Sequence, residues 1–198
     1  MFIDETAVST NMARLRGRAA SGVRVIGIVP LGKWETITFV AALRHNKMIA
    51  PMVVDGAMTG EMFLAYVESC LVPVLRRNDI VVMDNCRIHL GVAIRAAIEK
   101  SGATLRYLPK YSPDLNPIEL PYSKFKTFLR KVAARTIPGL TRAIRSFLPQ
   151  ISPQEEAYPV DSGLSRCSML SNRIGAVARV GTDGEGAVAC GIQEVVFR

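Results

Sequence analysis

The 198-residue sequence predicts an α/β domain in which helices cover the faces of a mixed β-sheet. Hydrophobic residues make up 49% of the chain, which is enough to build a core. Two runs of β-forming residues within 22–43 have the pattern of a hairpin. From residue 59 onward, helical and strand-like patterns alternate. A hairpin followed by such alternation is typical of a mixed sheet with helices packed on it.

The hairpin and a third extended run are expected to form the first part of the sheet. The segment GVRVIGIVPLGKWETITFVAAL, residues 22–43, has two runs dominated by Val, Ile, Thr and Phe, with a turn at residues 30–32. The run KMIAPMVVDG, residues 47–56, predicts a further strand. Pro51 is expected to interrupt it, because proline has no backbone N–H to donate.

A helix and a buried strand are predicted next. Residues 59–77 carry apolar side chains at helical spacing, Thr59 can cap the helix, and Pro73 is expected to bend or end it. Residues 79–84, DIVVMD, form a short apolar run that ends in an acid. Such a run is typical of a central strand that is buried on both faces.

The last elements continue the alternation. Residues 91–102 predict an amphipathic helix closed by Gly102, and residues 103–109 predict another strand. A helix is expected at residues 118–134, with a proline near its first turn, and a last short helix at 138–148.

The tail, residues 156–198, differs in character from the domain that we assign to residues 1–155. It has six glycines in 43 residues and little periodicity. It is neither charged enough to predict disorder nor patterned enough to predict structure. It can be loose or can add a strand, and we assign it no chemistry.

The positive charge belongs to the first part of the chain. The net charge is +8, and residues 1–155 hold 21 Lys and Arg against 12 Asp and Glu, whereas residues 156–198 hold 4 against 5. Such a balance favours a polyanionic partner, and nucleic acid is the commonest one. The alternative is a basic protein without such a partner.

Several protein classes are not expected. No apolar run is long enough to span a membrane, and the N-terminus lacks the pattern of a signal peptide, so we expect no membrane partner. The cysteines have no paired spacing for a zinc site or a disulfide framework, so reduced thiols and a cytoplasmic location are expected. They are Cys70, Cys86, Cys167 and Cys190.

Three acids stand where strand ends or helix starts are predicted. Asp4 follows a short apolar lead, Asp84 ends DIVVMD, and Glu119 opens the helix after SPDLNPI. Open sheets place their sites at the carboxyl ends of strands, so these acids can converge. Converging carboxylates repel each other unless cations neutralise them, and oxygen ligands suit Mg²⁺ or Mn²⁺. A pair of such ions acts on phosphodiesters.

Each acid also has an ordinary explanation. Asp4 and Glu5 can form a solvated pair near the terminus. Asp84 and Asn85 can form a turn or a helix cap. Glu119 can be a favourable charge in the first turn of a helix.

Other polar residues have two interpretations as well. His89 can be a hydrogen-bonded loop histidine, which we slightly favour, or can lie near a phosphate or beside the ligands of a metal. The cluster RLRGR can be a solvated turn or can contact phosphates. The basic face of the helix at 118–134 can meet DNA. The basic residues concerned are Arg14, Arg16, Arg18, Lys124, Lys126, Arg130, Lys131 and Arg135.

Three motifs resemble one known family. FIDET, VVMDNCRIH and LRYLPKYSPDLNPIE look like the DDE transposases of the mariner superfamily, in their bacterial insertion-sequence branch, the IS six-thirty group. The 34 residues between Asp84 and Glu119 match the spacing of that superfamily. The resemblance covers residues 1–155. It implies an RNase H-like fold, with a mixed five-stranded sheet and helices on both faces.

The resemblance also implies a chemistry and its residues. Asp4, Asp84 and Glu119 would bind two Mg²⁺ or Mn²⁺ ions and catalyse hydrolysis of DNA at a transposon end. The freed 3′-hydroxyl would then attack target DNA, commonly at a TA dinucleotide. Asn85 and Asn116 match positions beside the acids and would be supporting residues, and His89 is a third candidate because it lies five residues after Asp84. The DNA-binding candidates come from the basic charge and not from the resemblance, and they are Arg14, Arg16, Arg18, Lys110, Lys124, Lys126, Arg130 and Lys131.

Partners follow from the same resemblance: terminal inverted repeats, a second copy in a homodimer, and a location on the bacterial nucleoid. Two departures from the family pattern predict a fragment. No helix-turn-helix region precedes Asp4, and the tail does not match, as after a frameshift. A separate polypeptide is then expected to carry the DNA-binding region. The first strand is expected to be short, which would weaken the core and the site.

Two other functions are compatible with these observations. One is a catalytically dead transposase remnant that binds DNA weakly. The other is a host nuclease of RNase H-like fold that acts on RNA–DNA hybrids, against which the SPDLNPIE string argues.

Overall fold

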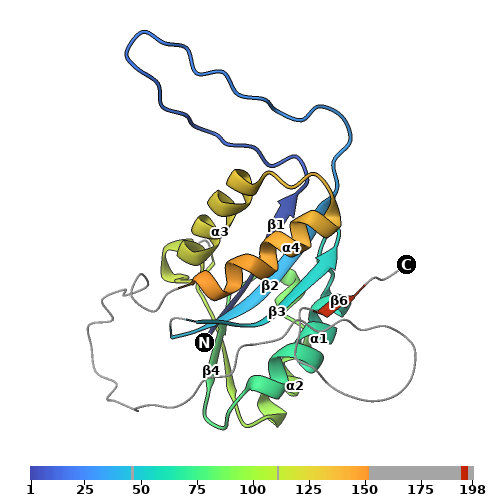
Figure 1. Cartoon of the computed structure of the whole chain (residues 1–198). Helices are drawn as coiled ribbons and strands as arrows, with labels where there is room; N and C mark the ends of the chain where they lie inside the picture. Colours follow the sequence, from blue (N-terminus) through green and yellow to red (C-terminus); the bar gives the residue numbers. More distant parts are fainter. Residues whose placement is uncertain (46, 111, 152–192, 196–198) are drawn as a thin grey trace.

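The computed structural model of the chain describes residues 1–45, 47–110, 112–151 and 193–195. Strands in this part of the chain form one mixed sheet in the order β5-β4-β1-β2-β3-β6, with helices on both faces (Figure 1). The predicted mixed sheet is therefore confirmed. The strands are β1 (Phe2–Ser9), β2 (Thr36–Arg44), β3 (Lys47–Asp55), β4 (Ile80–Met83), β5 (Thr104–Tyr107) and β6 (Gln193–Val195).

The first three strands form an antiparallel meander. β1 pairs with β2 over its whole length, from Phe2 opposite Leu43 to Ser9 opposite Thr36, and β2 pairs with β3. β1 is therefore an eight-residue central strand, and the expectation of a short first strand is wrong. Pairing with β2 along all eight residues gives β1 its length, which the sequence before Asp4 does not reveal.

The predicted hairpin at residues 22–43 is wrong in its first arm. Residues 22–29 form no strand and belong to a long connection, residues 10–35, which projects away from the sheet (blue in Figure 1). β2 already has β1 on one side and β3 on the other, so no edge of β2 is left for these residues. Their β-forming side chains stay exposed: Val23 by 61%, Ile26 by 87% and Ile28 by 94%.

Pro51 lies inside β3 and does not interrupt it. The register of β2 against β3 shifts between Val40 and Ala42, opposite the proline. Ala50 beside it has a left-handed backbone with a φ of 49°. A bulge of this kind accommodates a residue that cannot donate to the ladder, so the strand bends and continues.

β4 and β5 add to the other side of β1 as parallel strands. The pairing of β1 with β4 has two residue pairs, Phe2 opposite Val82 and Ile3 opposite Met83, and the strands then part. The predicted burial of β4 on both faces is wrong at its start, because Ile80 is 50% exposed. The strands separate at the point where Asp4 and Asp84 follow.

One face of the sheet is covered by α1 and α2. The Oγ1 of Thr59 accepts the N–H of Met62 at 3.3 Å, and Gly102 follows α2 with a φ of 84°, so both predicted ends are confirmed. Ile3 of β1 packs here with the aromatic rings of α1. The elements are α1 (Gly60–Tyr66), the π-turn η1 (Val67–Leu71), the 3₁₀ turns η2 (Val72–Val74) and η3 (Arg87–His89), and α2 (Val92–Lys100).

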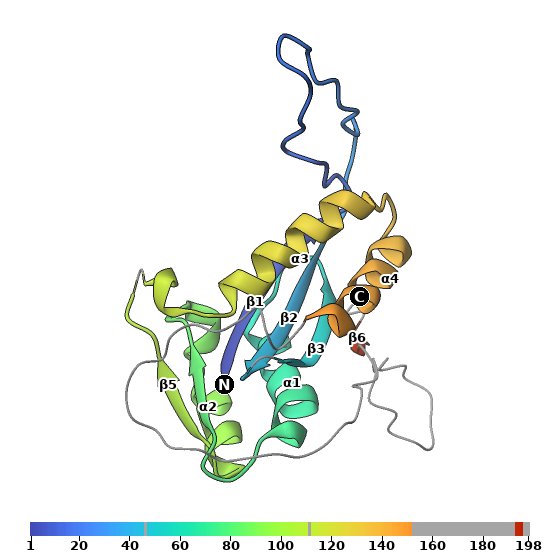
Figure 2. The same ribbon diagram turned by 60° about the vertical axis from the view of Figure 1, so that its left-hand side comes forward.

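The opposite face is covered by α3 and α4 (Figure 2). Phe39 of β2 lies 4.9 Å from Phe125 of α3, and Phe125 lies 5.2 Å from Phe147 of α4, between ring centroids. Phe2 and Val8 of β1 pack on this side, as expected from the alternation of side chains along a strand. The elements are η4 (Pro113–Leu115), α3 (Glu119–Val132), α4 (Ile137–Phe147) and η5 (Leu148–Gln150).

The tail predicted at residues 156–198 lies outside the described residues except for β6. β6 pairs in parallel with β3, from Met52 opposite Gln193 to Val54 opposite Val195, so the tail adds a strand to the sheet. Among the helices of the described residues, none has the length and hydropathy needed to cross a membrane.

Candidate active site

The three acids come from three elements that meet beside the centre of the sheet. Asp84 directly follows β4 and Glu119 is the first residue of α3, as predicted. Asp4 is the third residue of β1 and lies inside the strand, so its predicted place at a strand end is wrong. Asp4 nevertheless directly follows Ile3, the last residue of β1 that pairs with β4. From Asp4 onward, β1 pairs with β2 alone.

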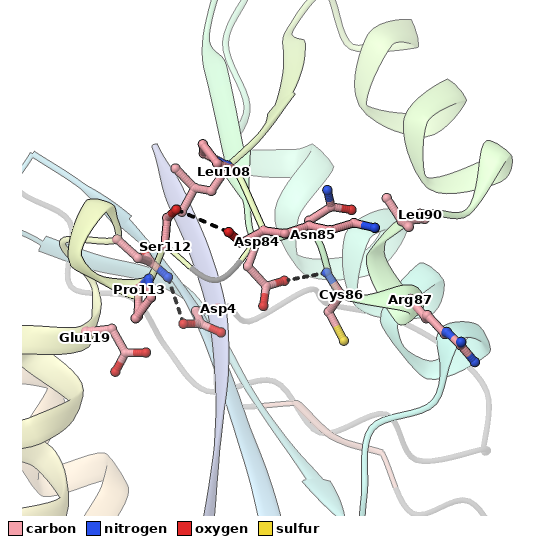
Figure 3. A pocket seen from close by; sticks show the side chains of 13 residues that line it. Asp4, Asp84, Asn85, Cys86, Arg87, Leu90, Leu108, Ser112, Pro113 and Glu119 are labelled. Carbon is pink, nitrogen blue, oxygen red and sulfur yellow. Dashed lines mark hydrogen bonds between the residues drawn. The ribbon is translucent and has the colours of Figure 1, made fainter.

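All three acids line one cavity of about 660 Å³. Figure 3 shows Asp4 between the other two, with the carboxylates of Asp84 and Glu119 pointing toward it from opposite sides. The predicted supporting residues Asn85 and Asn116 line the same cavity. The remaining wall is formed by Cys86, Arg87, Leu90, Leu108, Pro109, Lys110, Ser112 and Pro113.

Negative charge accumulates around Asp4. Burial and the charges of Glu5, Asp84 and Glu119 together raise the pKa of its carboxyl to about 7, although a hydrogen bond from the Glu5 N–H acts in the opposite direction. A carboxyl with this pKa is about half protonated at neutral pH. A cation placed beside these carboxylates would relieve their repulsion.

Two side chains hold Asp4 from the side of α3. The Nδ2 of Asn116 donates to Asp4 Oδ2 at 2.9 Å, and the hydroxyl of Tyr122 donates to the backbone carbonyl of Asp4 at 2.5 Å. Both side chains are buried. The Oδ1 of Asn116 is also buried, and it has no hydrogen-bond partner among the described residues. The predicted supporting position of Asn116 is thus next to the first acid.

His89 binds two carboxylates at once. Its Nδ1 lies 2.6 Å from Asp84 Oδ1, and its Nε2 lies 3.0 Å from Glu5 Oε2. Burial would lower the pKa of His89, but these two partners outweigh it and raise the pKa to about 10. The hydrogen bond between His89 and Asp84 lowers the pKa of the Asp84 carboxyl. His89 is therefore a hydrogen-bonded histidine, and its predicted place beside the ligands of a metal stays a prediction.

The donor set of the cavity fits a divalent cation by its chemistry. Three carboxylates line the cavity, and oxygen ligands of this kind are preferred by Mg²⁺ and Mn²⁺. In the part of the chain that the structure describes, no three His, Cys, Asp or Glu side chains stand in a ready-made metal cluster.

The predicted DNA-binding residues fall into three places. Lys110 lines the cavity. The basic residues of α3 follow the helix away from Glu119 toward the base of the segment 10–35 (Figure 2). Arg135, which follows α3, joins this end of the helix to the start of the segment 10–35, because its Nη1 donates to the carbonyls of Thr10 and Met12 at 3.0 and 2.8 Å. Arg14, Arg16 and Arg18 are exposed in that segment and are not in a strand.

Sequence reasoning missed three residues of the site. Glu5 was assigned only to a solvated pair, yet it binds His89. Tyr122 was not singled out, and Arg87 in the cavity wall was not either. The alternation of β1 carried a signal for Glu5, because it places Glu5 on the face of Ile3 and Asp4 on the opposite face. No local pattern distinguishes the other two.

Comparisons with known proteins give one family match. The profile of the DDE superfamily endonucleases matches residues 1–141. A search of curated proteins gives no match.

Solved structures of Mos1 transposase share the fold. A pre-cleavage Mos1 transpososome gives a TM-score of 0.60 at 14% identity, over 77% of this chain and 49% of that one. The Mos1 mariner paired end complex with Mn gives a TM-score of 0.58 at 14% identity, over 77% of this chain and 48% of that one. The Mos1 catalytic domain with Raltegravir and Mn gives a TM-score of 0.54 at 12% identity, over 78% of this chain and 72% of that one.

These likenesses concern the fold. The chain spans about half the length of the Mos1 chains in the two complexes. The predicted RNase H-like arrangement, a mixed sheet with five strands from the domain and helices on both faces, is confirmed by them.

Proposed function

The chain belongs to the DDE superfamily endonucleases, and we propose that it is the catalytic domain of a mariner-like transposase, which cleaves DNA strands and joins them to a target. One observation carries this proposal: Asp4, Asp84 and Glu119, separated by long stretches of sequence, line a single cavity. The family and the Mos1-like fold support the same activity.

We propose that the three acids hold two Mg²⁺ or Mn²⁺ ions. Mos1 complexes with Mn and with Mg are known, which supports a divalent ion in this fold. Asp4 is the residue that most requires a cation, because burial and three neighbouring acids raise its pKa to about 7. Such ions, when bound, supply Lewis acidity to both sides of a scissile phosphodiester.

The protein's own groups position the acids and the DNA. Asn116, which precedes α3, and Tyr122 of α3 hold Asp4, and the N–H of Cys86 donates to Asp84 Oδ1 at 3.1 Å. Lys110 and Arg87 line the cavity and are proposed to bind phosphate oxygens. Asn85 lines the same cavity and is proposed to support this arrangement.

The DNA is proposed to continue from the cavity along α3. Lys126 and Arg130 lie on this helix, and its end is held to the base of the segment that carries Arg14, Arg16 and Arg18. Exposed lysine and arginine side chains bind the phosphate backbone without regard to sequence. Lys124 and Lys131 are exposed on the same helix and are proposed to contribute to the same path.

The biological setting is also part of the proposal. The similar structures include a strand transfer complex and paired end complexes, which favours action on transposon ends by a homodimer. Target joining at TA is proposed from the sequence resemblance alone. The motif LRYLPKYSPDLNPIE favours the bacterial IS six-thirty branch and a place on the nucleoid in the cytoplasm. The chain spans half of the relatives' length, so a further DNA-binding region is proposed to act with it.

The decisive experiment is nicking of supercoiled plasmid in Mn²⁺ or Mg²⁺. Asp84→Asn and Glu119→Gln are compared with matched controls that change the same residue types elsewhere. Asp55→Asn alters an exposed acid at the end of β3, and Glu61→Gln alters an exposed acid in the first turn of α1. The wild type and both controls are expected to nick, whereas both site variants are expected to be inactive.

Other results would contradict the proposal. Equal background cleavage by all five folded proteins would favour a catalytically dead remnant that only binds DNA. Cleavage of RNA–DNA hybrids in preference to duplex DNA would favour a nuclease of another kind.

A further inference from the structure

His89 fills the gap that opens where β1 and β4 part. The two strands pair at Ile3 and Met83 and not beyond. His89 belongs to the short turn η3, which follows β4, and its side chain is only 1% exposed. The ring therefore lies between the two strand continuations that carry Asp4 and Asp84.

The ring joins these two continuations directly. Its Nδ1 bonds to Asp84 Oδ1 at 2.6 Å, and its Nε2 bonds to Glu5 Oε2 at 3.0 Å. Asp84 thereby becomes tied to β1 through His89 and Glu5, although the strands no longer share backbone hydrogen bonds there. Both ring nitrogens are occupied, so the ring cannot rotate without breaking both contacts.

Other elements fix the ring in place. Phe63 of α1 lies 4.3 Å from it between ring centroids. The backbone N–H of His89 donates to the carbonyl of Cys86 at 3.0 Å, and its carbonyl accepts the hydroxyl of Tyr107 at 2.9 Å. The histidine is thus held by contacts from α1, β1 and β5.

The contacts of Asp84 decide which of its oxygens faces the cavity. Oδ1 accepts from both His89 and the N–H of Cys86. In Figure 3, the other carboxylate oxygen points toward Asp4. The imidazole therefore sets the orientation of a carboxylate that lines the cavity.

The neighbouring acids Asp4 and Glu5 then have separate roles. Consecutive side chains of a strand point to opposite faces of the sheet. Asp4 lies on the α3 side, where Asn116 binds it, and Glu5 lies on the α1 side, where it binds His89. Glu5 is not among the residues that line the cavity.

We infer that His89 and Glu5 form a positioning pair, which holds the Asp84 carboxylate at a fixed place relative to Asp4 so that both can bind one divalent cation. This inference rests on the proposed function, because that function makes the two aspartates metal ligands. Neither residue of the pair binds the cation itself. Partners that orient metal ligands in this way typically contribute 10- to 100-fold to metal affinity.

Two amide substitutions separate the two contacts of the ring. In His89→Asn, the amide nitrogen can replace Nδ1 and still donate to Asp84. In His89→Gln, it can replace Nε2 and donate only to Glu5. Glu5→Ala removes the anchor on β1. The control is His45→Asn at the exposed turn between β2 and β3, where the φ of 53° is one that asparagine tolerates.

The readout is the dissociation constant of Mn²⁺ without DNA, measured from the electron paramagnetic resonance of free Mn²⁺. Thermal unfolding of each metal-free protein shows that it is folded at the assay temperature. We expect His89→Gln and Glu5→Ala to weaken Mn²⁺ binding about tenfold or more, His89→Asn less than His89→Gln, and His45→Asn not at all. A merely structural role would lower the unfolding temperature without producing this order.

Unchanged Mn²⁺ affinity in folded Glu5→Ala and His89→Gln would overturn the inference. If His89→Gln does not fold, Glu5→Ala decides the question alone, because Glu5 is partly exposed. A wild type that binds Mn²⁺ with these variant effects but cuts no DNA would refute the proposed function and leave the positioning pair supported. If the wild type binds no Mn²⁺, the inference is overturned, because there is then no ion for which His89 and Glu5 would position the Asp84 carboxylate.

Discussion

Replacing Asp4 by Asn should make the metal-free protein more stable at neutral and alkaline pH. The pKa of Asp4 rises from 3.8 to about 7 because the carboxyl is buried and lies near Glu5, Asp84 and Glu119. The native state therefore holds this proton more tightly than the unfolded state does. The resulting stabilisation is fully present below pH 3.8 and is lost as the pH rises through 7.

The size of the effect follows from the pKa. Each tenfold difference in proton affinity corresponds to about 1.4 kcal/mol, so full ionisation of Asp4 costs the native state up to about 4 kcal/mol. Asn cannot ionise and avoids this cost. The stability of Asp4→Asn relative to the wild type should therefore rise by about 2 kcal/mol between pH 5 and pH 7 and level off near pH 8.

The hydrogen bonds of Asp4 are expected to adapt to the substitution. In the wild type, the Nδ2 of Asn116 donates to Asp4 Oδ2. If the NH₂ group of the new asparagine occupies the position of Oδ2, two hydrogen-bond donors face each other there. The amide of Asn116 can turn so that its Oδ1, which has no partner among the described residues, accepts instead. Any loss of stability from imperfect hydrogen bonds of the new asparagine is independent of pH. It changes the stability difference between variant and wild type by the same amount at every pH.

The assay is urea unfolding of both proteins in EDTA at pH 5, 6, 7 and 8, with Asp55→Asn as the control. The measurement is then repeated with Mn²⁺. An ion present at 100 times its dissociation constant should stabilise the wild type by about 2.7 kcal/mol and the variant by much less. A difference between wild type and variant that does not change from pH 5 to pH 7 would refute the reasoning, as would equal stabilisation of both by Mn²⁺.

Two further outcomes are expected. Tyr122→Phe should lower the free energy of unfolding by about 1–2 kcal/mol in urea, because the buried carbonyl of Asp4 loses its hydrogen bond; an unchanged midpoint would mean that this bond contributes nothing. Combined substitution of Arg14, Arg16 and Arg18 by Ala should reduce the salt dependence of DNA affinity by about one charge per lost phosphate contact, measured by fluorescence anisotropy. Arg76→Ala, at the opposite end of β4 from Asp84, should leave that slope unchanged, and equal slopes for all three proteins would remove these arginines from the DNA path.

The sequence predicted those parts of the site that local patterns encode. An apolar run that ends in an acid identified β4 and Asp84, and the proline-rich turn before a helical pattern identified Glu119 at the start of α3. Helical spacing also identified the helices that cover the two faces of the sheet. These features depend on residues close together in the chain, and so they are visible in one short window.

The same local patterns failed where the answer depended on distant strands. Residues 22–29 have a β-forming composition, but β1 and β3 occupy both edges of β2. Asp4 stands near a terminus, yet its strand continues to Ser9 because β2 pairs with it throughout. Composition describes a preference for extended backbone, whereas a strand also needs an unoccupied neighbour to bond with.

The chemistry of the site shows this division most clearly. The chain itself determined that three acids and a histidine were present at family-like spacing. Only the tertiary structure decided that Asp4 has a pKa near 7, and that Glu5 belongs to His89 and not to solvent. Burial and the charges of residues brought from far along the chain determine the properties of a carboxylate, and these exist only once the sheet and helices have assembled.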